Sequence, residues 1–393
     1  MTQKNISPAI LDLAFRPFFL LGSVFSILAL IIWGATLYGW GNHTYYGYVQ
    51  LWHGHEMLFG FVAAIMVGFL LTAVQNWTGL RSVHGKTLIF LIVLWLAGRL
   101  AVWFATSLPW WLLIVIDCSF LLCAACLLAT LLWQKKQKRN YFVVLALLIL
   151  MANNLIFHLA VATNKLPVAS NSLHGVILLI TLMMTIIGGR IIPMFTANTT
   201  QVPPRARRQW LDNSGLILLW IMAFIYICQW QDLLPDSLLS LLFLATAILI
   251  AARCAMWRLT TTWRHALLWS LHLSYWFIPL GLLLLACHYA GLPLSMNTAL
   301  HALTVGAMGG LTLSMMSRVS LGHTGRPIIA SRIIGLALAF IFIAALCRVG
   351  LILISPAISL WAWWLSITLW TVAFLLFLYR YTRILLSPRV ISR

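Results

Sequence analysis

Histidine side chains gather at one level of the apolar segments of this chain. Of its eleven histidines, seven fall at or near the same end of their segments: His43, His53, His55, His158, His174, His288 and His301. His272 lies deeper in its segment. Imidazole is costly inside a bilayer and is the commonest metal ligand, so such a concentration predicts a site. The residues that we expect to bind metal are His53, His55, His158, His272 and His301.

A single glutamate accompanies these histidines. Glu56 is the only glutamate in the sequence. On an α-helix His53 and His55 point about 200° apart, whereas His53 and Glu56 lie about 60° apart and share a face. One side of this helix can therefore serve one centre while the other side serves a second. A carboxylate here is a candidate proton carrier or metal ligand, and the alternative is a charge that favours the helix N-terminus.

Two arginines lie in the same half of the apolar segments as the histidines. Arg99 and Arg348 occupy similar places in their segments. A buried guanidinium needs a neutralising partner. Haem propionates would supply the negative charge, and Asp117 is the alternative within the protein.

The amino-acid composition indicates that these residues lie in a lipid bilayer. Of 393 residues 63% are apolar and only 8% charged, whereas a soluble domain is about a quarter charged. The apolar runs exceed the length needed to cross a bilayer, which predicts an all-α polytopic membrane protein. We expect twelve transmembrane segments, at 18–40, 52–76, 87–106, 108–133, 140–163, 172–194, 211–230, 235–257, 265–290, 296–320, 329–353 and 357–386.

Basic residues alternate between the links. The net charge of +19 would suggest nucleic acid in a soluble protein. Here most of the Lys and Arg residues fall in the even-numbered links or near the chain ends, and Lys165 alone lies in an odd-numbered link. The positive-inside rule then places both termini in the cytoplasm and makes the basic residues topology signals. We expect a lipid partner and no nucleic acid.

Three of the segments resemble one another. Those at 52–76, 172–194 and 296–320 begin near His55, His174 and His301 and carry small residues four apart. Such stripes let helices, or a flat macrocycle, approach the backbone closely. The repetition predicts three four-helix units within one transmembrane domain over 1–393, with boundaries near 1–135, 136–257 and 258–393.

Several motifs resemble the NnrS family over most of the chain. They are FRPFFL (15–20), WHGHEMLFGF (52–61), GFLLTAVQNWTG (68–79), LAGR (96–99), GGRIIPMFT (188–196), HALTVGAMGG (301–310) and GHTGRP (322–327). The resemblance implies a bacterial inner-membrane protein with haem and copper, linked to denitrification and to resistance against nitric oxide. It implies neither the ligands nor the reaction, so an oxidoreductase and a nitric-oxide-binding protein both stay open.

The predicted architecture also has a known counterpart. Three four-helix units also build the catalytic subunit of haem–copper oxidases and nitric oxide reductases, where helices 2, 6 and 10 carry key metal ligands. This is a fold-level analogy. The segment 211–230 lacks the adjacent His-His pair of that superfamily, so a standard three-histidine copper site is not expected.

These observations together predict two centres. The first is a haem b between the segments 52–76 and 296–320, with His301 and either His53 or His55 as ligands. Arg99 and Arg348 would meet its propionates. The second centre uses the other face of 52–76, with Glu56 as proton carrier, His158 and, as a further candidate, His272. Imidazole with one carboxylate suits copper or iron.

Two other functions fit parts of the pattern. A transporter of a metal complex or of a small nitrogen species would also use intramembrane histidines and closely packed helices. A haem-based sensor would need a signalling partner. Cys123 and Cys126 are three apart and could form a soft metal site, although a role as small apolar packing residues explains them better. Nitric oxide or a related species is the expected ligand, and the electron donor is unknown.

The topology can be tested directly. Reporter fusions at Lys138 and Arg208 should report the cytoplasm, because basic links stay on the cytoplasmic side. A fusion at Asp232 should report the periplasm. The opposite pattern of signals would contradict the predicted orientation.

Overall fold

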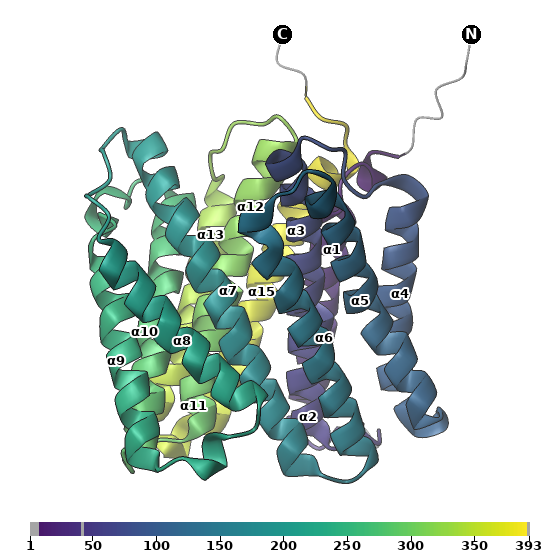
Figure 1. The fold of residues 1–393 in the computed structure, drawn as a ribbon, viewed down its shortest axis with the longest axis vertical. Helices are drawn as coiled ribbons and strands as arrows, with labels where there is room; N and C mark the ends of the chain where they lie inside the picture. Colours follow the sequence, from purple (N-terminus) through teal and green to yellow (C-terminus); the bar gives the residue numbers. More distant parts are fainter. Residues whose placement is uncertain (1–7, 41–42, 391–393) are drawn as a thin grey trace. The chain divides into compact units, whose positions relative to one another are not determined.

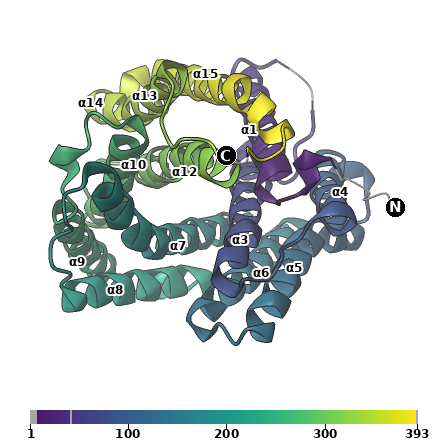
Figure 2. The same cartoon turned by 90° about the horizontal axis from the view of Figure 1, so that it is seen from above.

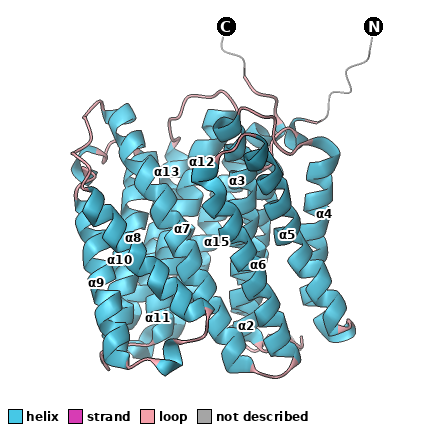
Figure 3. Cartoon of the chain, viewed as in Figure 1, coloured by secondary structure: helices cyan, strands magenta, loops and turns pink. Residues whose placement is uncertain are grey.

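The chain is helical throughout the part that the structure describes. A computed structural model describes residues 8–40 and 43–390, and within them there are helices and loops but no strand (Figures 1 and 3). Twelve helical segments in these ranges are long and apolar enough to cross a membrane. The predicted all-α architecture with twelve transmembrane segments is therefore confirmed.

Within the described residues, nine of the twelve segments each contain one long α-helix. These are α1 (Phe15–Leu37), α4 (Gly85–Trp103), α5 (Trp110–Gln134), α6 (Tyr141–Ala162), α7 (Leu166–Thr200), α8 (Gln209–Ile227), α9 (Asp236–Ala255), α10 (Ala266–Tyr289) and α15 (Ser359–Leu386). Their apolar composition on all sides is typical of helices in lipid.

The other three segments change from α-helix to π-helix partway across. They consist of α2 (Val49–His55), a π-helical segment (Glu56–Val62) and α3 (Ala63–Thr78); α11 (Met296–His301), a π-helical segment (Ala302–Gly309) and α12 (Gly310–His323); and α13 (Arg332–Leu346), a π-helical segment (Cys347–Leu351) and α14 (Ile352–Ile354). π-Helical turns are rare and frequently occur at functional sites. Two of them begin at the residue after a predicted ligand histidine.

Local sequence signals end and begin several helices. After Thr78, Gly79 adopts a left-handed conformation (φ 69°), and its N–H donates to the Gln75 carbonyl, which closes the end of α3. At the start of α11, the Ser295 hydroxyl accepts a hydrogen bond from the Thr298 N–H. Such caps satisfy backbone groups that a helix end otherwise leaves unpaired.

The chain forms two compact units. The first contains residues 1–173, 319–328 and 378–393, and the second contains residues 174–318 and 329–377. The division passes through α7, α12 and α15. The three four-helix units expected from the sequence are not confirmed, and the repeat boundaries stay a prediction.

In the first unit, α1 packs against α3 and contacts the C-terminal end of α15. The Phe15 N–H donates to the Thr72 hydroxyl at 3.1 Å, and a Cβ on Gly68 would stand 2.8 Å from the Phe18 Cβ. Arg16 donates to the Leu385 carbonyl at 2.8 Å. The first and last spans therefore meet at the same membrane face, as an even number of crossings requires.

In the second unit, α8, α9 and α10 follow one another as neighbours (Figure 2). The Arg253 Nε of α9 donates to the Asp212 carboxylate of α8 at 2.6 Å, and its Nη1 donates to the Tyr275 hydroxyl of α10 at 3.1 Å. A buried cation thus joins three helices. Ion pairing of this kind is what permits charge among apolar helices.

The small-residue stripes accommodate neighbouring side chains. A Cβ on Gly60 would collide with the Phe25 ring, and one on Gly306 with the Phe277 ring. Of the two uses that the sequence suggested for the stripes, close approach of helices explains these positions.

Candidate metal site

A cluster of six buried polar side chains lies inside the first unit. It comprises His55, Glu56, Arg99, Asp117, Asn154 and His158. Four spans supply them, because α2 and its π-helical continuation carry the first two and α4, α5 and α6 carry the others. These spans are otherwise apolar, so the cluster is a polar interior within a hydrophobic shell. Buried polar groups in such a setting must satisfy one another.

Arg99 lies between the two carboxylates of the cluster. Its Nη1 donates to Glu56 and its Nη2 donates to Asp117. Glycine makes this approach possible, because a Cβ on Gly98 would collide with the Asp117 carboxylate, and one on Gly60 would stand 3.0 Å from the Arg99 Nη1. The alternative named from the sequence, that Asp117 neutralises Arg99, matches this geometry.

His55 joins the ion pair to α6. Its Nδ1 lies 2.9 Å from the Glu56 Oε1, and its Nε2 lies 2.9 Å from the Asn154 Oδ1 and 3.2 Å from the Asp117 Oδ2. The ring also stacks on Phe157, with centroids 4.7 Å apart. His55 is completely buried. Both ring nitrogens thus face groups that fix the orientation of the imidazole.

His158 approaches the same carboxylate from α6. Its Nε2 lies 3.0 Å from the Asp117 Oδ2, and its Nδ1 lies 3.3 Å from the Tyr46 hydroxyl. Burial, and to a lesser extent the negative charge of Asp117, raises the pKa of the Tyr46 phenol. Tyr46 therefore stays protonated and can act as a hydrogen-bond partner of His158 across the physiological range.

Three of these side chains could hold a metal ion. One ligand atom each from His55, Asp117 and His158 lies within 4.8 Å of the others, and this is the only such group among the described residues. The outer nitrogen of each histidine has its own partner, Glu56 for one and Tyr46 for the other. Metal-binding histidines typically have such a partner, which fixes the tautomer and leaves the second nitrogen for the metal.

The charges of the cluster leave room for one more cation. Arg99 contributes +1, while Glu56 and Asp117 contribute −1 each, so their sum is −1. A proton that makes His55 an imidazolium would bring the sum to zero. A metal ion at the Nε2 atoms would replace that proton, because a ligating imidazole must be deprotonated there. A proton and a metal ion are therefore alternative ways to neutralise the same buried negative charge.

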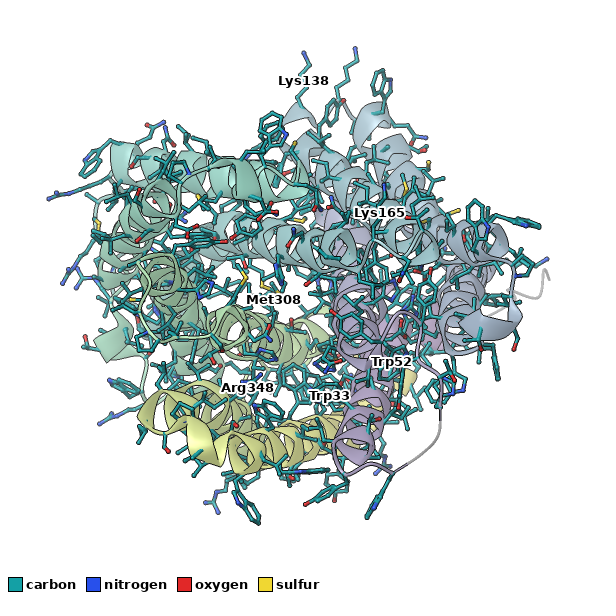
Figure 4. The ribbon with its side chains drawn as sticks, turned by 90° about the horizontal axis from the view of Figure 1, so that it is seen from below. Trp33, Trp52, Lys138, Lys165, Met308 and Arg348 are labelled. Atoms are coloured by element: carbon teal, nitrogen blue, oxygen red, sulfur yellow. The ribbon has the colours of Figure 1, made fainter. Side chains whose placement is uncertain are left out.

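Sequence reasoning placed Glu56 on the face of His53, but the carboxylate turns to His55 instead. The helical wheel assumes a uniform α-helix, whereas α2 ends at His55 and a π-helix begins at Glu56. Arg99 also attracts the carboxylate to the side on which Asp117 lies. The ring of His53 instead stacks on Trp33, with the two ring centroids 4.7 Å apart. Trp33 is labelled in Figure 4.

The remaining predicted ligands belong to the second unit. The Thr196 hydroxyl donates to the Ile192 carbonyl, so it accepts the Nε2–H of His272 at 2.8 Å. His301 donates its Nδ1–H to the Asn297 carbonyl at 2.6 Å. Neither histidine shares a unit with His55 and His158. The two-histidine haem and the contribution of His272 to a second centre stay predictions.

Arg348, labelled in Figure 4, lies beside His301. Its Nη2 is 3.2 and 3.3 Å from the two ring nitrogens of His301, so the guanidinium lies over the imidazole rather than on one edge. The Arg348 Cζ lies 5.5 Å from the centroid of the Trp363 ring. No carboxylate forms an ion pair with Arg348 in the described part of the chain.

Three members of the site escaped the sequence reasoning. The sequence indicates Asp117 only as a partner of Arg99 and yields no prediction for Asn154 or Tyr46. A signal existed for Asn154, which lies four residues before His158 and so shares its helix face. Tyr46 precedes α2 and gave no periodic signal.

The charge balance of the cluster predicts a stability effect. Asp117→Asn keeps the side-chain shape but leaves Arg99 with one carboxylate, so we expect a loss of about 3–5 kcal/mol in the free energy of unfolding. Thermal unfolding of the detergent-purified protein measures it, with the exposed Asp232→Asn as control. Equal midpoints for the two variants would contradict the role of Asp117.

Comparison with known proteins gives one family. The family described as NnrS protein matches residues 9–389, which is nearly the whole chain. A search of curated proteins gave no match.

Proposed function

Because the chain belongs to the NnrS family, we propose that it binds or detoxifies nitric oxide at protein-bound copper and haem in the bacterial inner membrane. Family membership supports a nitric-oxide-related function. The observation that carries the proposal is the buried His55, Asp117 and His158 group, whose ligand atoms converge in a bilayer-spanning unit. Removal of nitric oxide within the membrane, where this apolar gas dissolves, would protect the cell against nitrosative stress.

The donor set fits copper. Imidazole is a good ligand for copper and iron, and a single carboxylate is compatible with both. The two imidazoles and the net charge of −1 on Arg99, Glu56 and Asp117 favour a cation of low charge. Copper bound there would supply a centre that coordinates nitric oxide and exchanges single electrons. Iron is the alternative metal.

The surrounding residues of this chain prepare the ligands. The Glu56 carboxylate accepts the Nδ1–H of His55, which directs the Nε2 of that ring toward Asp117. Tyr46 does the same for His158 by engaging its Nδ1. Asn154 donates to the Asp117 Oδ2 at 2.7 Å and so holds the shared carboxylate oxygen in position.

Proton and substrate reach the cluster by different means. Nitric oxide is neutral and apolar, so it can enter through the lipid without a polar channel. Glu56 is the proton carrier of the proposal, because it contacts both His55 and Arg99 and is 2% exposed. The Glu56 Oε1 and the His55 Nδ1, between which a proton would move, are 2.9 Å apart. Turnover would also need an electron donor.

The second unit offers residues for haem. The Asn297 carbonyl accepts the Nδ1–H of His301, which leaves Nε2 as the ligating atom. Arg348 has no carboxylate partner in the described chain, and the Trp363 indole N–H has no hydrogen-bond acceptor there. A haem propionate would satisfy both donors. Arg99, in contrast, already has two carboxylates.

Copper content tests the metal site. His158→Ala removes one ligand without changing the charge sum, so purified protein should retain less than about a tenth of the wild-type copper per chain. The exposed His265→Ala is the control and should retain it fully. Wild-type copper content in His158→Ala, measured by elemental analysis, would contradict the assignment.

Haem spectroscopy tests the second unit. We expect His301→Ala to lose the low-spin haem absorption, because the imidazole that would hold the haem is gone, while copper content stays unchanged. A normal visible spectrum in this variant would exclude His301 as a ligand.

Growth in the presence of a nitric oxide donor tests the role of Glu56. Glu56→Gln keeps an oxygen that accepts from His55 but removes the exchangeable charge, so haem should remain while protection against a nitric oxide donor weakens. Growth under the donor and haem content are measured on the same cells. Full protection with intact haem would mean that Glu56 carries no proton.

A further inference from the structure

A buried arginine in α12, at the opposite end of its span from His301, has no carboxylate partner among the described residues. Arg318 of α12 is 8% exposed and forms none of the ion pairs in the described chain. Its Nε has no hydrogen-bond partner. The guanidinium lies 3.8 Å from the centroid of the Phe195 ring of α7, a cation–π contact. A lone cation in this setting calls for an anion.

The acids of the second unit are committed elsewhere. Asp212 pairs with Arg253 and Arg207. Asp232 and Asp236 lie in the link and first turn around the start of α9. Within residues 8–40 and 43–390, no carboxylate therefore forms an ion pair with Arg318.

Two unsatisfied hydroxyls accompany this cation. Ser314 lies one helical turn before Arg318 on α12, and Ser270 lies one turn before Ser274 on α10. Both hydroxyls are buried without a hydrogen-bond partner. The two helices meet where a Cβ on Gly310 would collide with the Ser274 hydroxyl.

The register of the two helices brings these groups toward one another. Consecutive spans that are joined by a short link run antiparallel. The helices α10 and α12 belong to two such spans and therefore run antiparallel. Ser314 lies one turn after Gly310 on α12, and Ser270 lies one turn before Ser274 on α10. On antiparallel helices both steps lead in the same direction, toward Arg318. Hydroxyls left unsatisfied in an apolar interior are costly, and three unpartnered donors on one path indicate an absent acceptor.

The planar shape of the guanidinium selects the shape of that acceptor. Its Cζ lies 3.8 Å from the centroid of the Phe195 ring, and the Nε–H on one edge of the guanidinium is buried without a hydrogen-bond partner. That edge matches a planar anion with two oxygens, which accepts two parallel hydrogen bonds. We propose that Arg318, Ser314 and Ser270 form a binding site for a small planar two-oxygen monoanion such as nitrite or formate.

This site is distinct from the metal and haem residues. Arg318 follows His301 by 17 positions, or about 25 Å along a helix, and it belongs to the unit that lacks the metal cluster. The inference does not depend on the proposed metal chemistry.

Ligand-dependent thermal stability tests the site. The full-length protein in detergent is heated with the sodium salts of nitrite, formate or chloride at equal ionic strength, and the unfolding midpoint is followed with concentration. An anion that binds only the folded state raises the midpoint. We expect nitrite and formate to raise it in a saturable way and chloride to have no effect at the same concentrations.

Three variants identify the residues. Arg318→Lys should weaken the apparent affinity by about tenfold or more, because an ammonium cannot make the paired contact. Ser314→Ala keeps the cation and should weaken it severalfold. The exposed Arg264→Lys is the matched control and should bind as the wild type does.

The outcomes separate the possible sources of the anion. Saturable binding that Arg318→Lys and Ser314→Ala both weaken supports the proposal. It is overturned if the folded wild type shows no saturable shift, if chloride acts as nitrite does, or if both variants bind normally. Stabilisation by laurate but not by nitrite or formate would also overturn it, since the site would then hold a lipid carboxylate.

Discussion

The ion pair of Arg99 with Glu56 and Asp117 is the interaction on which the polar interior of the first unit depends. Each charge alone would be expensive among apolar helices, and only their mutual pairing makes burial tolerable. Because one cation faces two carboxylates, one negative charge is left over. That excess draws His55 and His158 to the same carboxylate oxygen of Asp117. The charge balance thus leaves one negative charge that a proton or the proposed metal ion would neutralise.

The two units use a similar local design for opposite charges. A histidine ends an α-helix, a π-helical segment follows, and an arginine from the next span approaches: His55 with Arg99 in the first unit, and His301 with Arg348 in the second. In the first unit the arginine meets carboxylates, so the surroundings suit a cation. In the second it meets no carboxylate in the described chain, so the surroundings suit an anion such as a propionate.

The architecture follows from the sequence more fully than the site does. Apolar length alone predicts twelve spans, because the bilayer fixes the length of a crossing helix. The choice of His55, His158 and Glu56 as candidate site residues also follows from their chemistry. Their partners do not, since the approach of Asp117 depends on Gly98 and on how α4 and α5 pack. The turn of Glu56 toward His55 depends on a π-helix, which a uniform helical period cannot indicate.

X-ray absorption at the copper edge of the purified protein tests the central claim, that the buried histidine and aspartate group holds the metal. The account predicts a first shell of nitrogen and oxygen with multiple scattering from two imidazoles and no sulfur. This follows because the ligand set contains no thiol and because Cys123 and Cys126 lie outside it. A first shell dominated by sulfur, or one without imidazole scattering, would contradict it.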